Sequence, residues 1–166
     1  IWINSGRGTF RAIDPLKLRH TSRSAMGLDF ADIDRDGYDD IIVLDMLARE
    51  HGKRMTQLVK DPLDAQILEQ VSGVPAYNRN TLFLGRPDGS YAEAAFMAGV
   101  AATDWSWCPV FIDVDLDGFE DLLVTNGFEF DAMDRDSFDR IRGRKLTQAQ
   151  LKRSRQFYPR WPTQNA

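Results

Sequence analysis

One acidic pattern occurs twice in this chain, and it limits the possible folds more than any other feature of the sequence. Residues 32–40 read DIDRDGYDD and residues 113–121 read DVDLDGFED, so the two segments start 81 positions apart. Each has acidic residues at positions 1, 3, 5 and 9 and a glycine at position 6. Carboxylates this close together repel one another unless a cation lies among them. The glycine lets the backbone fold back, so that alternate side chains point inward.

Calcium is the cation that suits these segments best. It accepts about six to eight oxygen ligands in loose geometry, whereas magnesium keeps several waters and requires a strict octahedron. A solvated acidic turn without an ion is the alternative for one such pattern, and a second copy at matching positions weighs against it. The sequence therefore predicts two calcium sites. Their predicted side-chain ligands are Asp32, Asp34, Asp36 and Asp40 in the first segment and Asp113, Asp115, Asp117 and Asp121 in the second, with the backbone carbonyls of Tyr38 and Phe119 as fifth donors.

The same pattern opens the calcium loop of an EF-hand, but the residues that follow it argue against that fold. An EF-hand loop needs a bidentate glutamate at position 12 and a helix behind it. Position 12 is Val43 in the first segment and Val124 in the second, and neither side chain can bind a metal. Apolar runs lie on both sides of each segment, as in residues 41–44 (IIVL). Such runs are typical of buried strands, so each segment is predicted to join two strands of a hairpin.

The duplication extends beyond the acidic segments. Shifting the chain by the same 81 positions places residues 2–10 (WINSGRGTF) on residues 83–91 (FLGRPDGSY), so that aromatic, glycine and hydroxyl residues coincide. Each of these stretches is predicted to form a strand, a glycine-containing turn and a second strand. The chain is therefore an internal repeat, and repeats of this kind indicate propellers, solenoids or arrays.

With these motifs the chain resembles a known family. The aliphatic-aromatic strand, the turn at residues 6–10 (GRGTF) and the acidic loop with its apolar strand are similar to FG-GAP/VCBS-type repeats of calcium-binding β-propellers, the fold that integrin α-subunit heads also use. Residues 103–107 (TDWSW), the second loop and residues 125–127 (TNG) resemble bacterial secreted VCBS proteins of the ASPIC/UnbV-associated group. The resemblance covers roughly residues 1 to 140. The long stretch between residues 47 and 80 departs from it, because ordinary repeats have a shorter connection there.

The resemblance implies a mainly β chain that forms an incomplete β-propeller, with blades of four antiparallel strands. It assigns residues 1–13 to the last two strands of one blade, 25–95 to a full blade with an insertion at 47–80, and 108–130 to the first strands of the next blade. Residue patterns predict that the insertion is helical and that residues 131–166 form a helical and loop tail. Propellers close with about four to eight blades. With about two blades' worth of strands, the chain is expected to be a piece of a longer protein whose remaining blades are its partners.

The insertion has helical patterns. Residues 49–59 are predicted to be helical, and a second helix is predicted to start at Asp61 and to end near Gly73. A helical excursion packed on the propeller rim is the favoured interpretation, and a lobe that binds a partner or substrate is the alternative.

The tail is also predicted to contain helices. Thr147 and Gln150 make a capping box for a helix that runs to about Phe157. The aspartates at positions 131, 134, 136 and 139 are interpreted as a helix N-terminus rather than a third calcium site, because Ser137 stands where a loop glycine is needed. The many arginines and lysines of this region are interpreted as a solvated or paired basic face, and contact with an anionic polymer is the alternative.

Three residues of one apolar stretch carry further predictions. Trp105 and Trp107 share one face of a predicted strand, where they either fill the space between blades or stack on carbohydrate. Cys108, the only cysteine, is expected to be a buried thiol.

The predicted function is a non-catalytic, calcium-binding structural or interaction module for adhesion or ligand binding, with an unknown protein or glycan ligand. The sequence has no G-x-S-x-G elbow and no phosphate-binding glycine loop. The alternative is part of a propeller-based, polysaccharide-acting enzyme whose catalytic residues lie outside this chain.

Charge and hydropathy bound the partners and the location. The net charge of −4 does not indicate nucleic acid. No apolar run approaches the roughly 20 residues that cross a bilayer, so no membrane span is predicted. Calcium sites of extracellular modules have dissociation constants on the order of 10⁻⁴ to 10⁻³ M, and such concentrations occur outside the cytosol. The expected location is therefore extracellular, periplasmic or on the cell surface.

Overall fold

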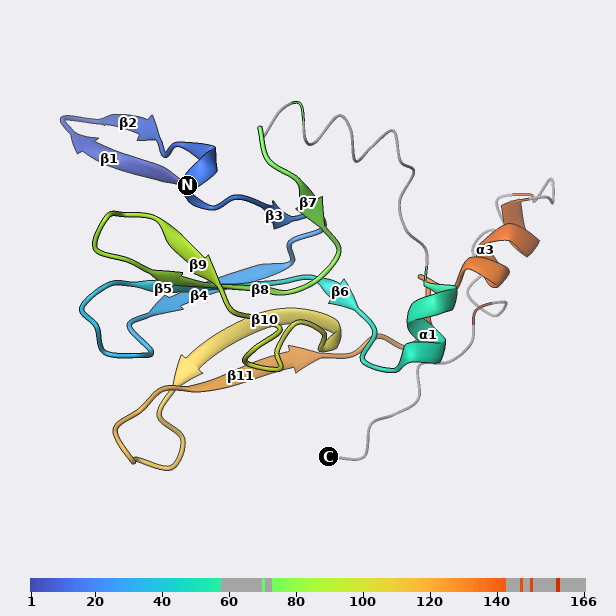
Figure 1. Ribbon diagram of the computed structural model, residues 1–166. Coiled ribbons are helices and arrows are strands. Elements are labelled where there is room, and N and C mark those ends of the chain that lie inside the picture. The colour runs from blue at the N-terminus through green and yellow to red at the C-terminus, as the bar shows by residue number, and fades with distance from the viewer. Residues whose placement is uncertain (58–69, 71–72, 143–146, 148–149, 151–157, 159–166) are drawn as a thin grey trace.

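The computed structural model describes residues 1–57, 70, 73–142, 147, 150 and 158. Strands prevail among these residues and two α-helices accompany them, so the prediction of a mainly β chain with antiparallel hairpins is confirmed. Figure 1 shows the sheets on one side of the molecule and the two helices on the other. Neither described helix has the length and apolar character needed to cross a bilayer. The arrangement of the sheets as propeller blades, with the predicted boundaries, remains a prediction.

The largest sheet has four antiparallel strands. In spatial order these are β4 (Gly27–Ala31), β5 (Asp40–Leu44), β8 (Thr81–Gly85) and β9 (Tyr91–Glu93). In its register, Ile41 of β5 lies opposite Phe30 on one side and Phe83 on the other. The first acidic segment forms the bend between β4 and β5, as the apolar runs around it predict.

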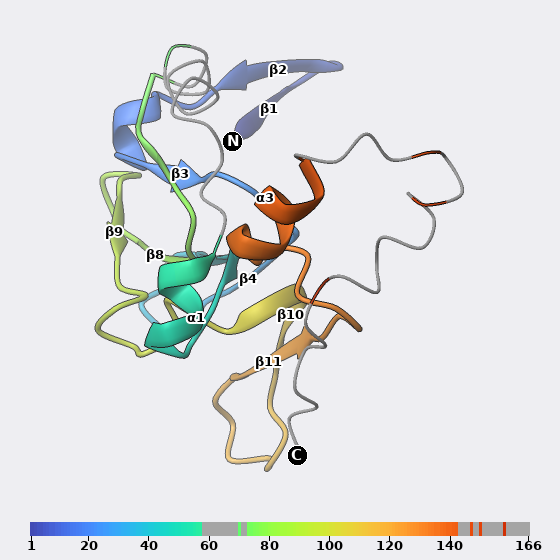
Figure 2. The same ribbon diagram turned by 90° about the vertical axis from the view of Figure 1, so that its right-hand side faces the viewer.

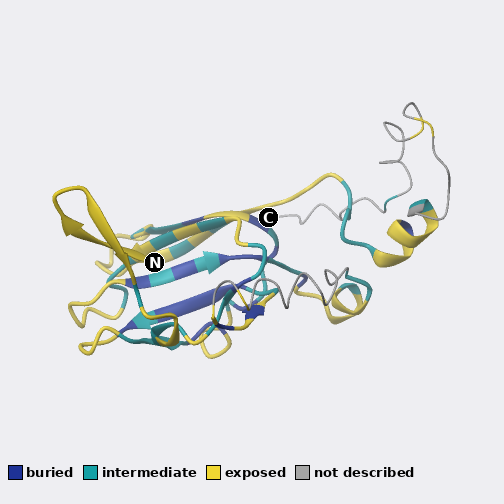
Figure 3. Cartoon of the chain, turned by 90° about the horizontal axis from the view of Figure 1, so that it is seen from above, coloured by how far each residue is buried: buried dark blue, intermediate teal, exposed yellow. Residues whose placement is uncertain are grey.

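The hydrophobic core is centred on β5. Alternate residues of this strand are buried, and Ile42 and Leu44 are fully inaccessible, as the period-two pattern of a strand requires. They pack with Leu82 and with alanines of the segment after β9. Burying a large aliphatic side chain stabilises the fold by about 1.5–3 kcal/mol. The acidic bend before β5 is therefore joined to a strand that the hydrophobic core holds in place. Figure 3 shows the buried strands flanked by exposed bends.

A second antiparallel hairpin carries the other acidic segment. It consists of β10 (Asp104–Ile112) and β11 (Asp121–Asn126), and β6 (Met46–Leu47) pairs with the start of β10. β10 begins before the predicted boundary at residue 108, because its first residues find a pairing partner in β6. The acidic segment forms the bend between β10 and β11, as predicted.

The two sheets meet where β4 lies beside β10. The backbone N–H of Phe111 donates to Oδ2 of Asp29 at 2.8 Å. A Cβ atom at Gly27 would lie 2.5 Å from the carbonyl oxygen of Trp107 and 2.9 Å from Cδ of Pro109. Only a glycine permits this approach of the two backbones.

The N-terminal residues form the predicted hairpin, which projects from the rest of the described structure. β1 (Trp2–Gly6) pairs with β2 (Thr9–Ala12), and every residue of both strands is exposed. Figure 3 shows this hairpin in yellow at the left. A 3-10 turn (Pro15–Lys17) then leads to β3 (Thr21–Ser22), which pairs in parallel with β7 (Ala76–Tyr77).

Only part of the predicted insertion at 47–80 lies within the described residues, so its overall helical content remains a prediction. Its ends contribute to the short strands β6 and β7, which pair with β10 and β3. These pairings come from distant parts of the chain, so the local sequence pattern does not indicate them. α1 (His51–Thr56) lies within the predicted helix 49–59, whose end falls outside the described residues. The predicted helix from Asp61 to Gly73 lies almost entirely outside them.

A second helix, α3 (Arg135–Arg142), lies in the tail where helix is predicted. Oδ1 of Asp134 accepts the N–H of Ser137 at 2.8 Å and caps this helix, and Asp136 lies in its first turn, so these two aspartates lie at a helix N-terminus. Figure 2 shows α3 beside α1, and a backbone bridge joins the segments next to them. Thr147 and Gln150 make the reciprocal hydrogen bonds of the predicted capping box. The remainder of that helix, and most of the basic tail, lie outside the described residues.

The exposure of the side chains of β10 differs in part from the prediction. Trp105 stacks on Phe128 with ring centroids 4.6 Å apart, whereas Trp107 is 40% exposed. Cys108 is exposed, so the prediction of a buried thiol is wrong. A β-bulge between Ser106 and Cys108 breaks the alternation of the strand, and two successive residues therefore face outward.

Candidate metal centre

Two loops with the same backbone conformation carry the predicted ligands. Residues 32–40 are termed loop 1 and residues 113–121 loop 2. At position 4, Arg35 and Leu116 are left-handed, with φ of 61° and 63°. The glycines at position 6 both have a φ of 88°. The left-handed region is unfavourable for residues with a side chain, so other interactions must hold position 4 in each loop.

Hydrogen bonds from the backbone to the aspartates hold loop 1 in this shape. Asp32 accepts the N–H of Asp36 on Oδ1 at 3.0 Å and that of Gly37 on Oδ2 at 2.9 Å. Oδ1 of Asp34 accepts the same Asp36 N–H at 3.2 Å, and Oδ1 of Asp36 accepts the N–H of Tyr38 at 2.9 Å. Each carboxylate oxygen has a further lone pair, so the same aspartates retain acceptor capacity for a cation.

Loop 2 repeats these bonds almost unchanged. The N–H groups of Asp117 and Gly118 lie 3.0 and 2.9 Å from the two carboxylate oxygens of Asp113. The corresponding bonds to Asp115 and Asp117 measure 3.2 and 2.8 Å. The loops differ at positions 2, 4, 7 and 8, so the shared aspartates and glycine determine the conformation.

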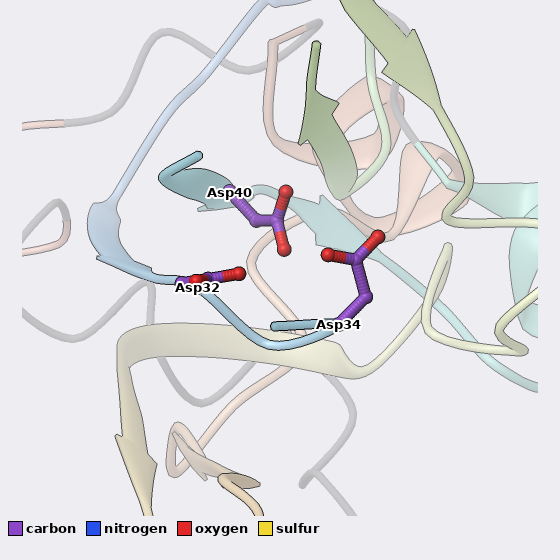
Figure 4. Close-up of side chains that lie close together, drawn as sticks. All are labelled: Asp32, Asp34 and Asp40. Atoms are coloured by element: carbon purple, nitrogen blue, oxygen red, sulfur yellow. The ribbon is translucent and has the colours of Figure 1, made fainter. Parts of the chain in front are cut away.

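Three carboxylates gather in each loop. Candidate ligand oxygens lie within 4.8 Å of one another in both groups, and Figure 4 shows the loop 1 side chains turned toward one another. The groups are Asp32, Asp34 and Asp40 in loop 1 and Asp113, Asp115 and Asp117 in loop 2. Of the predicted side-chain ligands, Asp36 and Asp121 lie outside these groups.

Position 9 has different surroundings in the two loops. Asp40 is fully buried, and its oxygens accept the N–H groups of Gly85 at 2.8 Å and Ile33 at 3.1 Å. Burial raises the pKa of the Asp40 carboxyl, these two hydrogen bonds oppose the rise, and neighbouring aspartates add to it. Asp121 is exposed and accepts the N–H of Val114 at 3.1 Å. A cation in loop 1 would favour the charged form of Asp40.

The donor chemistry of both groups fits a calcium ion. Both groups found among the described residues consist of aspartates alone. Sulfur and imidazole ligands, which zinc and copper favour, contribute to neither group, and oxygen donors are those of hard cations. Calcium tolerates a loose set of such donors better than magnesium does.

The hairpin of β1 and β2 followed by β4, loop 1 and β5 is a combination that can be compared with known families. A family model described as an FG-GAP-like repeat matches residues 1–43. FG-GAP-like repeats are structural modules of β-propeller type, and the match ends within β5. Comparisons with curated proteins and with solved structures give no match. The finer resemblance to VCBS and ASPIC/UnbV-associated proteins remains a prediction.

Two residues shape loop 1 and its surroundings, although no sequence pattern identified them. Gly85 donates to Asp40, and a Cβ atom at Gly85 would lie 2.7 Å from the carbonyl oxygen of Asp39. A glycine in an apolar strand is a signal of close backbone approach, but it does not say to what. Arg35 reaches from loop 1 to Phe119 of loop 2, a contact between residues far apart in the chain.

Proposed function

We propose that this chain is a calcium-stabilised part of a β-propeller, which acts as a structural and interaction module and has no catalytic activity of its own. The observation that carries the proposal is the repetition of one geometry. Two loops with matching hydrogen bonds each gather three carboxylates at the bend between two strands. Clustered carboxylates destabilise a bend unless a cation neutralises them, so their presence at both bends favours ion binding.

In this proposal, calcium supplies the neutralising charge, and the residues of the chain orient its ligands. Backbone N–H groups hold the aspartates in place, and the carbonyls of Tyr38 and Phe119 are proposed as further donors. The bends are the closed ends of the β4–β5 and β10–β11 hairpins. Locking them favours the folded chain, so the free energy of ion binding becomes free energy of folding.

Exposed apolar side chains support the proposal that further blades of the same parent protein cover part of this molecule. Leu28 and Phe30 of β4 are 63% and 62% exposed, and Val114 of loop 2 is 65% exposed. Leu28 and Phe30 lie two positions apart on β4 and so share one face of the strand, and an exposed apolar face is typical of surfaces that pack against another element. The ligand of the assembled module is proposed to be a protein or a glycan. An extracellular, periplasmic or cell-surface location is part of the proposal, because weak calcium sites fill only outside the cytosol.

Calcium stoichiometry tests this proposal. Equilibrium dialysis is expected to find one ion for each of the two carboxylate groups. Asp34→Ala and Asp115→Ala, which change position 3 of the two loops, are each expected to remove one ion. Asp88→Ala is the matched control, since Asp88 is an exposed aspartate that accepts the N–H of Ser90 outside both loops. An unchanged stoichiometry in both loop variants would contradict the proposal.

A further inference from the structure

One side chain connects loop 1 to loop 2. The guanidinium carbon of Arg35, at position 4 of loop 1, lies 4.0 Å from the centroid of the Phe119 ring, at position 7 of loop 2. A Cβ atom at Gly118 would lie 3.5 Å from Nη2 of Arg35, so the guanidinium also approaches the backbone of loop 2. This geometry is that of a cation–π contact.

Both ends of the contact belong to backbone that carries proposed ligands. Arg35 lies between two aspartates of loop 1, and the N–H of the following Asp36 is bonded to aspartates of the same loop. The N–H of Phe119 donates to Oδ1 of Asp117 at 2.8 Å, and its carbonyl is a proposed calcium donor. When loop 1 becomes more or less ordered, Arg35 therefore moves, and when loop 2 does so, Phe119 moves.

We propose that Arg35 is a positioning residue that couples the two calcium sites. Ordering of loop 1 directs the Arg35 side chain onto Phe119 and thereby favours ion binding in loop 2. This inference rests on the proposed calcium binding. Coupling between two binding sites is reciprocal, so an ion in loop 2 favours binding in loop 1 by the same factor. A partly exposed cation–π contact corresponds to a factor of about two to five in an equilibrium constant.

Electrostatic repulsion acts in the opposite direction. Two bound cations repel each other, and the charge of Arg35 disfavours a cation in loop 2. Salt weakens this repulsion, because the Debye length is about 8 Å at 0.15 M ionic strength, whereas the short Arg35–Phe119 contact persists. The net coupling is therefore expected to be positive at that ionic strength.

Two glycine amides allow the loops to be followed separately. Gly37 donates to Asp32 and Gly118 donates to Asp113, each at 2.9 Å, so each amide reports on the first aspartate of its own loop. Calcium chloride is titrated into ¹⁵N-labelled protein in about 0.15 M NaCl, and both amides are followed by NMR. The titration is repeated with Asp34→Ala, with Arg35→Gln and with the double variant. Asp34→Asn replaces the alanine variant if that variant does not fold.

The expected result is a dependence of loop 2 on loop 1 that requires Arg35. Asp34→Ala should raise the calcium midpoint of Gly118 about two- to fivefold when Arg35 is present and leave it unchanged in the Arg35→Gln protein. Phe119→Leu, which keeps the charge of Arg35, should abolish the dependence in the same way. The inference is overturned if Asp34→Ala shifts Gly118 equally with and without Arg35, or does not shift it at all.

A control and a separate outcome complete the experiment. Leu116 occupies position 4 of loop 2 with the same backbone conformation and is 85% exposed. Leu116→Gln should therefore leave the calcium midpoint of Gly37 unchanged. If it shifts the Gly37 midpoint as much as Arg35→Gln shifts the Gly118 midpoint, the effect belongs to position 4 of either loop, and the inference is overturned. If neither Gly37 nor Gly118 saturates in the unaltered protein, calcium binding itself fails. That result differs from two saturating but independent loops, which contradict the coupling alone.

Discussion

Oδ1 of Asp40 accepts the backbone N–H of Gly85 at 2.8 Å, and this buried bond fastens loop 1 to strand β8. The equivalent aspartate of loop 2, Asp121, is exposed and bonds to Val114 within its own loop. The same position of the repeat therefore belongs to the core in one copy and to the surface in the other.

This difference predicts unequal costs for the same substitution. Asp40→Ala is expected to lower the free energy of unfolding by about 1–3 kcal/mol without calcium, because the buried N–H of Gly85 and the partly buried N–H of Ile33 lose their acceptor. Asp121→Ala is expected to cost less than about 0.5 kcal/mol, since water can reach the N–H of Val114. Urea unfolding in the presence of a chelator measures both values. Equal losses would show that the bond to Gly85 contributes nothing to the fold.

Removal of calcium is expected to lower the melting temperature, and its return to restore it. A ligand that binds only the folded chain stabilises it by mass action, by about 2.7 kcal/mol per site at about 100 times the dissociation constant. Scanning calorimetry in chelator and then in excess calcium measures the effect. Magnesium at the same concentration is the control and should stabilise less, because it sheds its waters reluctantly. A melting temperature that is the same with and without calcium would count against both loops as ion sites.

His20 is expected to make the protein less stable as the pH falls below about 6.5. Nη2 of Arg79 lies 3.1 Å from Nε2 of His20, and a guanidinium can only donate, so the imidazole accepts this bond in its neutral form. Burial lowers the pKa of His20, the charge of Arg79 lowers it further, and Glu93 opposes both. The unfolded chain therefore binds the proton first. The stabilisation is complete above the unfolded pKa and is lost as the pH falls toward the folded pKa.

The His20→Gln variant tests this pH dependence, since glutamine keeps an acceptor and does not titrate. Its melting temperature should fall less than that of the unaltered protein between about pH 7.5 and pH 5.5. His51→Gln is the matched control, because His51 is exposed at the start of α1. If the three proteins lose stability in parallel, His20 is not the responsible group.

Gly27→Ala is expected to destabilise the protein by about 1–3 kcal/mol, because a Cβ atom there overlaps the backbone of β10. The same substitution at Gly52 in α1 is the control, since its Cβ atom would meet only Oε1 of Glu50 at 3.5 Å. Gly52→Ala is expected to stabilise by about 0.4–1 kcal/mol. Thermal unfolding compares the two variants. A Gly27→Ala protein as stable as the original would mean that β4 and β10 do not approach as closely as described.

The bends could be predicted from the sequence because nearby residues determine them. The spacing of aspartates and glycine sets the loop conformation, and the apolar runs around it form the paired strands. The second copy strengthens each of these sequence signals. In the structure, Gly37 and Gly118 adopt the same φ.

The remaining features depend on contacts between distant segments. The two-residue strands β6 and β7 are too short to show any periodicity, and they exist because β10 and β3 lie beside them. The bulge after Ser106 leaves Cys108 exposed, and no local sequence pattern predicts this bulge. In the same way, the bond from Gly85 to Asp40 and the contact of Arg35 with Phe119 follow only from the packing of whole strands.

The exposed Cys108 gives this protein a natural attachment point. It is the only cysteine of the chain, and it lies on β10, the strand that leads into loop 2. A maleimide dye or a nitroxide coupled there would report from a single defined place without any engineered residue. In aerated solution the same thiol can join two molecules covalently, so a reducing agent belongs in every measurement on this chain.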